Sequence, residues 1–202
     1  SSNRRQRQMC IRDSHCTDKT FYDILKITNK PLVATHSSPR KFTPNFERNM
    51  SDNMIKDLAN NNGLIMLNFG SGFISEQSNK SFGDINSKVE KYKIQNNLED
   101  SDKKLLKYKD DLINSVKPFA SINDFIDTID YVKELVGIDH IGLGSDFEGL
   151  GNTLPYDLKD ASTYPNILYN LLEREYSEIE IKKICSDNLF RVWNANLQNR
   201  QI

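Results

Sequence analysis

The sequence predicts an α/β fold in which amphipathic helices cover a parallel β-sheet. Three short apolar runs, at residues 31–35, 64–69 and 140–144, are bounded by turn residues and rich in aliphatic and β-branched side chains. Runs of this kind are typical of buried strands rather than helices. The stretches between them show helical periodicity, and strands separated by helices indicate βαβ units and a parallel sheet.

The first part of the chain alternates helix and strand. Thr17 is suited to cap a helix, and the strand at residues 32–35 follows that helix. Ser51 is suited to cap a second helix, for which Gly63 supplies a left-handed stop. The second strand then begins, and its apolar run continues to residue 69. This region therefore predicts one βαβ unit preceded by a helix.

The middle of the chain changes in composition. Residues 76–118 are rich in Asn, Lys, Asp and Ser, which predicts an insertion outside the core. Its second half, 103–116, still has the apolar spacing of a helix. Ser121 then caps a strongly amphipathic helix that Gly137 terminates, and this helix leads into the third strand.

The last third of the chain is predicted to be helical. Pro165 begins a helix, and Ser177 with Glu180 has the spacing of a capping box for another. In the first of these helices the positions expected to face inward are Leu168, Leu171 and Leu172. In the final segment, 187–197, the positions expected to contact the body of the protein are Leu189, Phe190, Val192 and Trp193.

The bulk properties limit the class of protein. A chain of 202 residues can form one large domain, and we count about three to four βα units, too few to close an eight-stranded barrel. The net charge of −1 gives no electrostatic basis for binding nucleic acid or an anionic membrane. The three cysteines are odd in number and do not indicate a disulfide framework. No stretch approaches the roughly 18 apolar residues of a membrane helix.

The first residues are unlike the rest of the chain. Residues 1–13 show no periodicity, and residues 8–14 resemble a translated sequencing adapter. We therefore interpret 1–13 as an artefactual leader and assign the fold to residues 14–202. The alternative, a basic arm that binds nucleic acid, is not supported by the charge balance of the remaining chain.

Two histidines are placed to share one edge of the sheet. His36 ends the first strand, and His15 lies directly before the Thr17 cap. In a parallel sheet both would project from the carboxyl edge, where imidazoles suit a zinc ion. The alternative for each is a hydrogen bond to a neighbouring backbone group. His140 opens its strand instead of ending it, so we expect it at the opposite edge in a packing role.

Two charged residues are further candidates. Asp146 follows Gly144 and Ser145, small residues that allow the backbone to approach a ligand closely. It could bind a metal, hold a substrate ammonium or pass a proton to a leaving amine, or it could simply cap the next turn. Glu148 should point into solvent. Arg48 could bind a carboxylate through a bidentate fork, although surface solvation is the commoner fate of a loop arginine.

Six segments together resemble the membrane (renal) dipeptidase family of zinc metallopeptidases. Their order and spacing match that family from about Ser14 to the C-terminus, apart from the insertion. The segments are Ser14–Tyr22, Pro31–Ser38, Glu47–Asn49, Leu67–Ser71, His140–Gly149 and Asp187–Trp193.

The resemblance implies a (β/α)8 barrel that binds two zinc ions and hydrolyses dipeptides with a metal-activated water. It implies that His15 and His36 are ligands of one zinc. Asp146 would meet the substrate amine and assist proton transfer, and Arg48 would receive the substrate carboxylate. Phe73 occupies a position that helps to form the substrate pocket. Members of the family are commonly dimers, so a homodimer is expected of the full-length protein.

The chain also departs from the family. We find no counterpart of the family's His-x-Asp motif or of its bridging glutamate, and Asp139-His140 has the wrong order and lies at the wrong strand end. We therefore expect the C-terminal part of a dipeptidase barrel, with a partial zinc site and no activity alone. A non-catalytic α/β binding module derived from the same barrel is the alternative.

Overall fold

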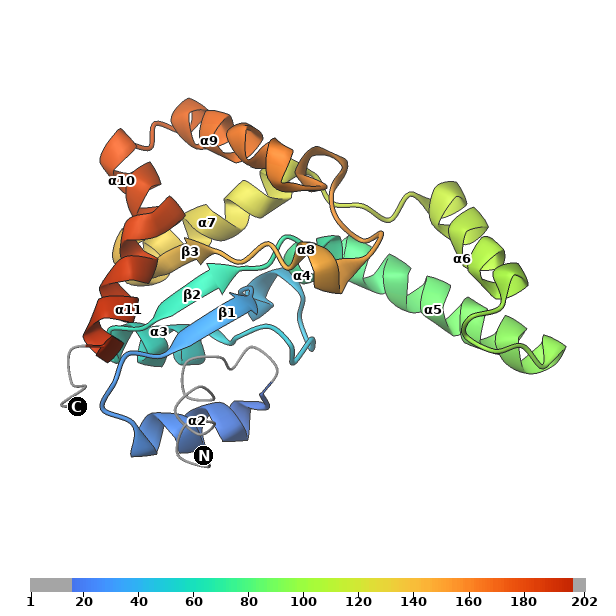
Figure 1. Cartoon of the computed structure of the whole chain (residues 1–202), viewed down its shortest axis with the longest axis horizontal. Helices are drawn as coiled ribbons and strands as arrows, with labels where there is room; N and C mark the ends of the chain where they lie inside the picture. The colour runs from blue at the N-terminus through green and yellow to red at the C-terminus, as the bar shows by residue number, and fades with distance from the viewer. Residues whose placement is uncertain (1–15, 198–202) are drawn as a thin grey trace.

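A three-stranded parallel sheet forms the centre of the molecule. The computed structural model describes residues 16–197, in which the strands follow the spatial order β1 (Val33–Ser37), β2 (Leu64–Leu67) and β3 (Ile141–Leu143) (Figure 1). Ile65 pairs with Ala34 on one side and with Ile141 on the other. All three predicted strands are therefore present, and the sheet is parallel as the alternation of strands and helices predicted.

Helices surround the sheet and connect its strands. The α-helices are α2 (Asp18–Ile27), α3 (Asp52–Asn60), α4 (Ser71–Ile74), α5 (Glu76–Asn96), α6 (Lys103–Val116), α7 (Ile122–Val136), α8 (Phe147–Leu150), α9 (Tyr164–Glu173), α10 (Glu178–Lys182) and α11 (Asn188–Leu197). The shorter helical turns are η1 (Arg40–Phe42), η2 (Ile138–His140), η3 (Tyr156–Leu158), η4 (Ala161–Thr163) and the π-helical η5 (Lys183–Asp187). None of the helices within residues 16–197 has both the length and the apolar character needed to cross a bilayer.

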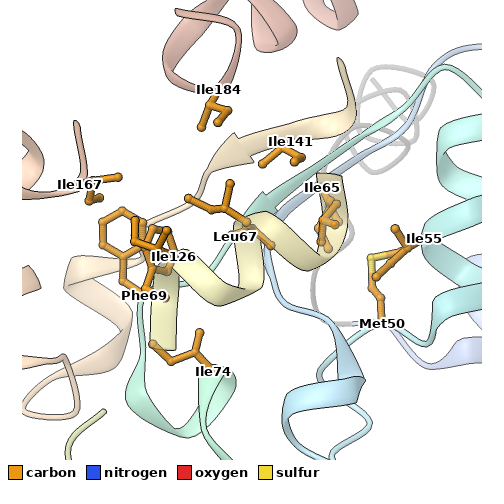
Figure 2. Close-up of a cluster of buried hydrophobic side chains, with 14 of the residues drawn as sticks. Met50, Ile55, Ile65, Leu67, Phe69, Ile74, Ile126, Ile141, Ile167 and Ile184 are labelled. Carbon is orange, nitrogen blue, oxygen red and sulfur yellow. The ribbon is translucent and has the colours of Figure 1, made fainter. Parts of the chain in front are cut away.

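The two faces of the sheet have different partners. Ile65, Leu67 and Ile141 belong to the main core, together with side chains of α3, α7 and α9 (Figure 2). Leu64 and Val33 belong to a smaller cluster with side chains of α11. Successive strand residues point to opposite faces, so neighbours such as Leu64 and Ile65 serve different layers. Burial on both faces explains why the strands appear as continuous apolar runs.

The predicted helix caps are confirmed. The side chains of Thr17, Ser51, Ser121 and Ser177 each accept a hydrogen bond from a backbone N–H in the first turn of the following helix. The Ser177 capping box is formed as predicted.

The stop assigned to Gly63 was wrong. Asn62 takes the left-handed conformation, with φ of 57°. Gly63 is needed for space instead, because a Cβ there would lie 2.6 Å from the carbonyl oxygen of Leu32. Asparagine tolerates the left-handed region better than most residues, so it can end a helix in place of glycine.

Some predicted core positions are exposed. Leu172 lies on the surface, and Ile167 fills the corresponding inward position of α9. On α11, Val192 is buried, whereas Phe190 and Trp193 are 60% and 55% exposed. The helix carries two apolar stripes, and periodicity alone does not show which of them faces the sheet.

The Asn- and Lys-rich region forms a helical hairpin that extends away from the sheet (Figure 1). α6 has the predicted bounds, but α5 was missed. α5 has few apolar residues on any one face, so its sequence gives little helical signal. The two helices pack against each other, and the rings of Tyr92 and Tyr108 stack with centroids 4.1 Å apart. The proposed leader, residues 1–13, lies outside the described residues.

Candidate active site

Polar side chains gather where the three strands end. His36 lies in β1, Asn68 directly follows β2, and Asp146 lies three residues beyond β3. The Asn68 N–H donates to the Ser37 carbonyl over 2.9 Å, and the Gly144 N–H donates to the Leu67 carbonyl over the same distance. These bonds continue the pairing of the strands into their loops. The carboxyl edge of the sheet is where α/β proteins place their functional groups.

His36 is half-buried, and a neighbour orients its ring. The Nδ1 atom lies 2.9 Å from the Thr35 hydroxyl, within hydrogen-bond distance. A hydrogen bond to one ring nitrogen fixes the orientation of the ring and the direction of the other nitrogen. The Thr35 hydroxyl can donate or accept, so this contact is compatible with either tautomer. This contact is compatible with a metal-ligating imidazole, and it differs from the alternative, a hydrogen bond to a backbone group, because its partner is a side-chain hydroxyl.

Asp146 has an unusual backbone conformation. Its φ of 55° and ψ of 33° lie in the left-handed region, and it occupies the N-cap position of α8. Its side chain makes no capping bond, and Oδ2 instead accepts a hydrogen bond from Asn68 Nδ2 at 3.2 Å. The residue thus has the capping position but directs its carboxylate to the end of the sheet. Left-handed residues other than glycine are strained and concentrate at functional sites.

Two glycines allow this close packing. A Cβ on Gly144 would lie 2.3 Å from the carbonyl oxygen of Thr35, so only glycine lets the end of β3 approach β1. A Cβ on Gly149 would lie 2.3 Å from Asp146 Oδ1. The first glycine permits the strand ends to converge, and the second leaves room for the carboxylate.

Arg48 lies in the loop after η1, half-buried and close to Phe73. Its guanidinium carbon is 5.3 Å from the centre of the Phe73 ring. Burial lowers the pKa of Arg48, and the negative charge of Asp146 acts in the opposite direction. An arginine side chain stays charged in proteins. The site therefore holds a partly desolvated cation within the field of a carboxylate.

Hydrogen bonds fix the loop that carries Arg48. The Ser37 hydroxyl donates to the Arg48 carbonyl over 3.0 Å, and Asn49 Nδ2 donates to the Phe73 carbonyl over 2.7 Å. Phe46 packs edge-on against Phe73, with centroids 5.3 Å apart. Arg48 and Phe73 are therefore positioned together, from two segments that β2 separates in the sequence.

An ion pair joins this loop to α2. Arg40 donates two hydrogen bonds to Asp18, over 2.9 and 2.6 Å, in a fork-to-fork arrangement. The Arg40 guanidinium holds the pKa of the Asp18 carboxyl below its usual value. The start of α2 is thus attached to the loop that positions Arg48.

The structure places some of the residues selected from the sequence at the carboxyl edge and others elsewhere. His36, Arg48 and Asp146 lie on the strand and loops of one edge, and Phe73 lies in the short helix α4 that follows β2. His15 lies outside the described residues. His140 lies at the other end of the sheet, where Nδ1 is 2.9 Å from the Gly63 carbonyl oxygen. This position agrees with the packing role expected of it.

Sequence reasoning missed two asparagines at this edge. Asn68 and Asn49 are 0% and 1% exposed, and both donate hydrogen bonds within the site. Asn68 follows an apolar strand in the same way as Asp146 does, so the rule that selected Asp146 could have selected it. Nothing in the sequence signals the burial of Asn49 in a long loop.

The described residues do not form a complete metal centre. Within residues 16–197 no three His, Cys, Asp or Glu side chains come together in a way that could hold a metal ion. A catalytic zinc normally takes three protein ligands. Among the described residues, His36 is the histidine at the carboxyl edge and His140 lies at the other end of the sheet, so we derive no catalytic step through a metal from these residues.

Comparison with known proteins gives a consistent result. The family model described as membrane dipeptidase, peptidase family M19, matches residues 3–201. An uncharacterized dipeptidase of Schizosaccharomyces pombe is 28% identical over 186 residues, which are 92% of this chain and 35% of that protein. An uncharacterized protein from the pqqA 5′ region of Klebsiella pneumoniae is 28% identical over 185 residues, 92% of this chain and 54% of its own length.

Solved structures share the fold. The probable dipeptidase PvdM of Pseudomonas aeruginosa aligns with a TM-score of 0.70 and 23% identity, over 92% of this chain and 50% of that structure. A metallopeptidase of Rhodobacter sphaeroides, bound to a phosphinate mimic of the dipeptide L-Ala-D-Ala, aligns with a TM-score of 0.66 and 24% identity. That alignment covers 91% of this chain and 41% of the structure. The chain therefore spans about half or less of the proteins it resembles.

Proposed function

The chain belongs to the membrane dipeptidase family, peptidase family M19, and on that premise we propose that it forms the C-terminal part of a zinc-dependent dipeptidase barrel. The reaction would be hydrolysis of the peptide bond of a dipeptide. The parallel sheet of three strands supports this assignment, because it is too small to close a barrel. The alignment of the chain supports it too, since it covers 41% and 50% of two related structures. The comparisons do not favour the alternative of a non-catalytic binding module.

The observation that carries the proposal is that an arginine and a carboxylate lie at the same carboxyl edge of the sheet. Arg48 and Asp146 lie close enough for the carboxylate to influence the guanidinium. A free dipeptide has an ammonium group at one end and a carboxylate at the other. We assign the carboxylate to Arg48, whose planar fork suits it, and the ammonium to Asp146. Phe73, against the face of Arg48, would form one wall of the pocket.

Zinc is the expected cofactor. We propose His36 and His15 as ligands of one ion, with Thr35 holding the His36 ring in a fixed orientation. When bound, the metal would supply a water that is nucleophilic near neutral pH. Asp146 would hold the substrate amine and assist proton transfer. Because two imidazoles are too few to complete a catalytic zinc site, which normally takes three protein ligands, we propose that this chain alone binds zinc weakly and is inactive.

The charge assignment can be tested by binding, without catalysis. We expect the purified chain to bind alanylalanine weakly, with an affinity measurable by NMR shifts. Asp146→Asn should weaken binding of the free dipeptide but not of its N-acetyl derivative. Arg48→Met should weaken binding of the free dipeptide but not of its C-terminal amide. Equal losses for all three ligands in both variants would contradict the assignment.

The proposed inactivity has a direct test. The purified chain, supplied with zinc and alanylalanine, should release no alanine above the rate of a blank. Release of alanine that His36→Ala abolishes would refute this part of the proposal. The homodimer proposed for the full-length protein is a separate question, and sedimentation velocity would answer it.

A further inference from the structure

Asn68 is a fully buried polar residue at the carboxyl edge. Its side chain is 0% exposed. Its backbone is held on both sides, since its N–H donates to the Ser37 carbonyl and its carbonyl accepts from the Ser38 hydroxyl at 3.5 Å. A fully buried side-chain amide needs hydrogen-bond partners for its donors and its acceptor, so these partners show which groups it positions.

The orientation of the Asn68 amide follows from one contact. Its Oδ1 lies 2.7 Å from the backbone nitrogen of Gly70, and a backbone N–H can only donate. The oxygen must therefore face Gly70, as in an Asx turn, and the NH2 group must face Asp146. The bond from Nδ2 to Asp146 Oδ2, at 3.2 Å, thus has a fixed direction.

The Asp146 carboxylate is confined from a second side. Gly149 packs so closely that a Cβ there would lie 2.3 Å from Oδ1. Oδ2 accepts one hydrogen bond from Asn68, and the carboxylate keeps further lone pairs with which it can accept from an ammonium. Because Asn68 is neutral, it orients the carboxylate without cancelling its charge.

We propose that Asn68 is a positioning residue that holds the Asp146 carboxylate in the orientation required to receive the substrate amine. This inference rests on the proposed function for the identity of the ligand. The contact between the two side chains can be tested separately. Groups that act through preorganised neighbours lose function when those neighbours change, even if the fold survives.

The matched variants are Asn68→Asp and Asn188→Asp. Asn68→Asp keeps the shape and the acceptor for Gly70 but replaces the donor beside Asp146 with a second carboxylate. Asn188 is the control, because it is 3% exposed and donates over 2.8 Å to the backbone carbonyls of Ile138 and Ile141. Both substitutions place a carboxylate where a buried amide donated, but only the first acts on Asp146.

The readout is the ratio of the affinities for alanylalanine and N-acetyl-alanylalanine, measured by NMR titration of the full chain. We expect Asn68→Asp to lower this ratio about tenfold, since a hydrogen bond to a charged group is lost and like charges are brought together. Asn188→Asp should lower the melting temperature and leave the ratio unchanged. An unchanged ratio in Asn68→Asp, or an equal change in both variants, would overturn the inference.

A spectroscopic test separates this inference from the proposed function. Asp146→Gly removes the carboxylate without straining a residue whose φ is 55°. We expect the side-chain amide protons of Asn68 to shift and to exchange at least several-fold faster in this variant. Unchanged amide signals would overturn the inference even if dipeptides bind. If the amide signals shift in Asp146→Gly but the unsubstituted chain binds no dipeptide, the proposed ligand is refuted and the contact is supported.

Discussion

Charged side chains have different kinds of partner in the outer helices and at the carboxyl edge of the sheet. Between α7 and α9–α10, Arg174 donates to Asp127 and Asp130, and Tyr176 donates to Asp130 over 2.6 Å. At the sheet edge, Asp146 meets the neutral amide of Asn68 and Arg48 meets the face of an aromatic ring. In the outer helices, the positive charge of Arg174 and the negative charges of Asp127 and Asp130 compensate one another.

The comparison shows how one chain can use ionic groups for two purposes. Direct pairing in the helical layer attaches α9 and α10 to α7. At the sheet edge, the neutral amide of Asn68 orients the Asp146 carboxylate without cancelling its charge. Substitutions of charged residues in the outer helices should therefore change stability, and substitutions of charged residues at the sheet edge should change binding.

The largest effect is expected where the strand ends converge. Gly144→Ala places a Cβ 2.3 Å from the Thr35 carbonyl and 2.8 Å from the Met66 carbonyl, both of them backbone atoms that cannot move away easily. We expect a loss of about 3 kcal/mol in the free energy of unfolding, at the upper end for overpacking. Urea unfolding followed by circular dichroism measures it. A loss below about 1 kcal/mol would show that the edge is more adaptable than the structure suggests.

The next effect concerns the helical layer. Asp130→Ala removes the acceptor of the Tyr176 hydroxyl, which belongs to a residue only 5% exposed, and one partner of Arg174. We expect a loss of about 2 kcal/mol in the free energy of unfolding, because a buried hydroxyl is left without its partner. Dipeptide affinity should stay within twofold of the parent. A tenfold loss of affinity without a loss of stability would break the distinction between the two regions.

A smaller change is expected for Arg48, at the carboxyl edge where the dipeptide is proposed to bind. Arg48→Lys keeps the positive charge but loses the planar fork and the contact with the Phe73 ring. We expect the affinity for alanylalanine to fall about tenfold, equivalent to about 1.4 kcal/mol. The affinity for the dipeptide amide should hardly change, and the melting temperature should stay within a few degrees. Calorimetry or NMR titration with both ligands makes this measurement.

The smallest effect is a pH dependence in the helical layer. Hydrogen bonds from Lys133, at 2.7 Å, and from Ser177 lower the pKa of Glu180 to about 2. The stability from this depressed pKa is present above the ordinary value of 4.5 and is lost as the pH falls through about 2.

Glu180→Gln keeps an acceptor for the capping box but removes the charge, which makes it the matched variant. Because the side chain is partly exposed, we expect a difference of at most about 1 kcal/mol at pH 7, shrinking towards zero below pH 4. Unfolding measured at several pH values would show it. A difference independent of pH would contradict the assignment to the charge.

Local features of the fold could be predicted from the sequence. The strands, the four capped helix starts and the bounds of α6 depend on short-range patterns, and these predictions are confirmed. α5 was missed because its composition gives no apolar stripe. The exposure of Phe190 and Trp193 was missed because the choice between two stripes depends on tertiary packing.

The site was predictable in its parts but not in its assembly. Asp146, Arg48 and Phe73 were selected as candidates, and their roles stay predictions. The contact between Asn68 and Asp146 joins residues 78 positions apart, and no sequence spacing encodes it. The left-handed conformation of Asp146 also depends on its surroundings, because this residue type adopts it only where the environment favours it.

The exposed face of α11 has a practical consequence for every unfolding experiment described above. Trp193 is the single tryptophan of the chain, and its side chain is already 55% in contact with solvent. Its fluorescence should change little when the core melts, so emission would understate the cooperativity of unfolding. The same indole would respond strongly to any molecule that covers α11. In this protein tryptophan emission is a sensor of surface contacts, and stability has to be followed through the backbone.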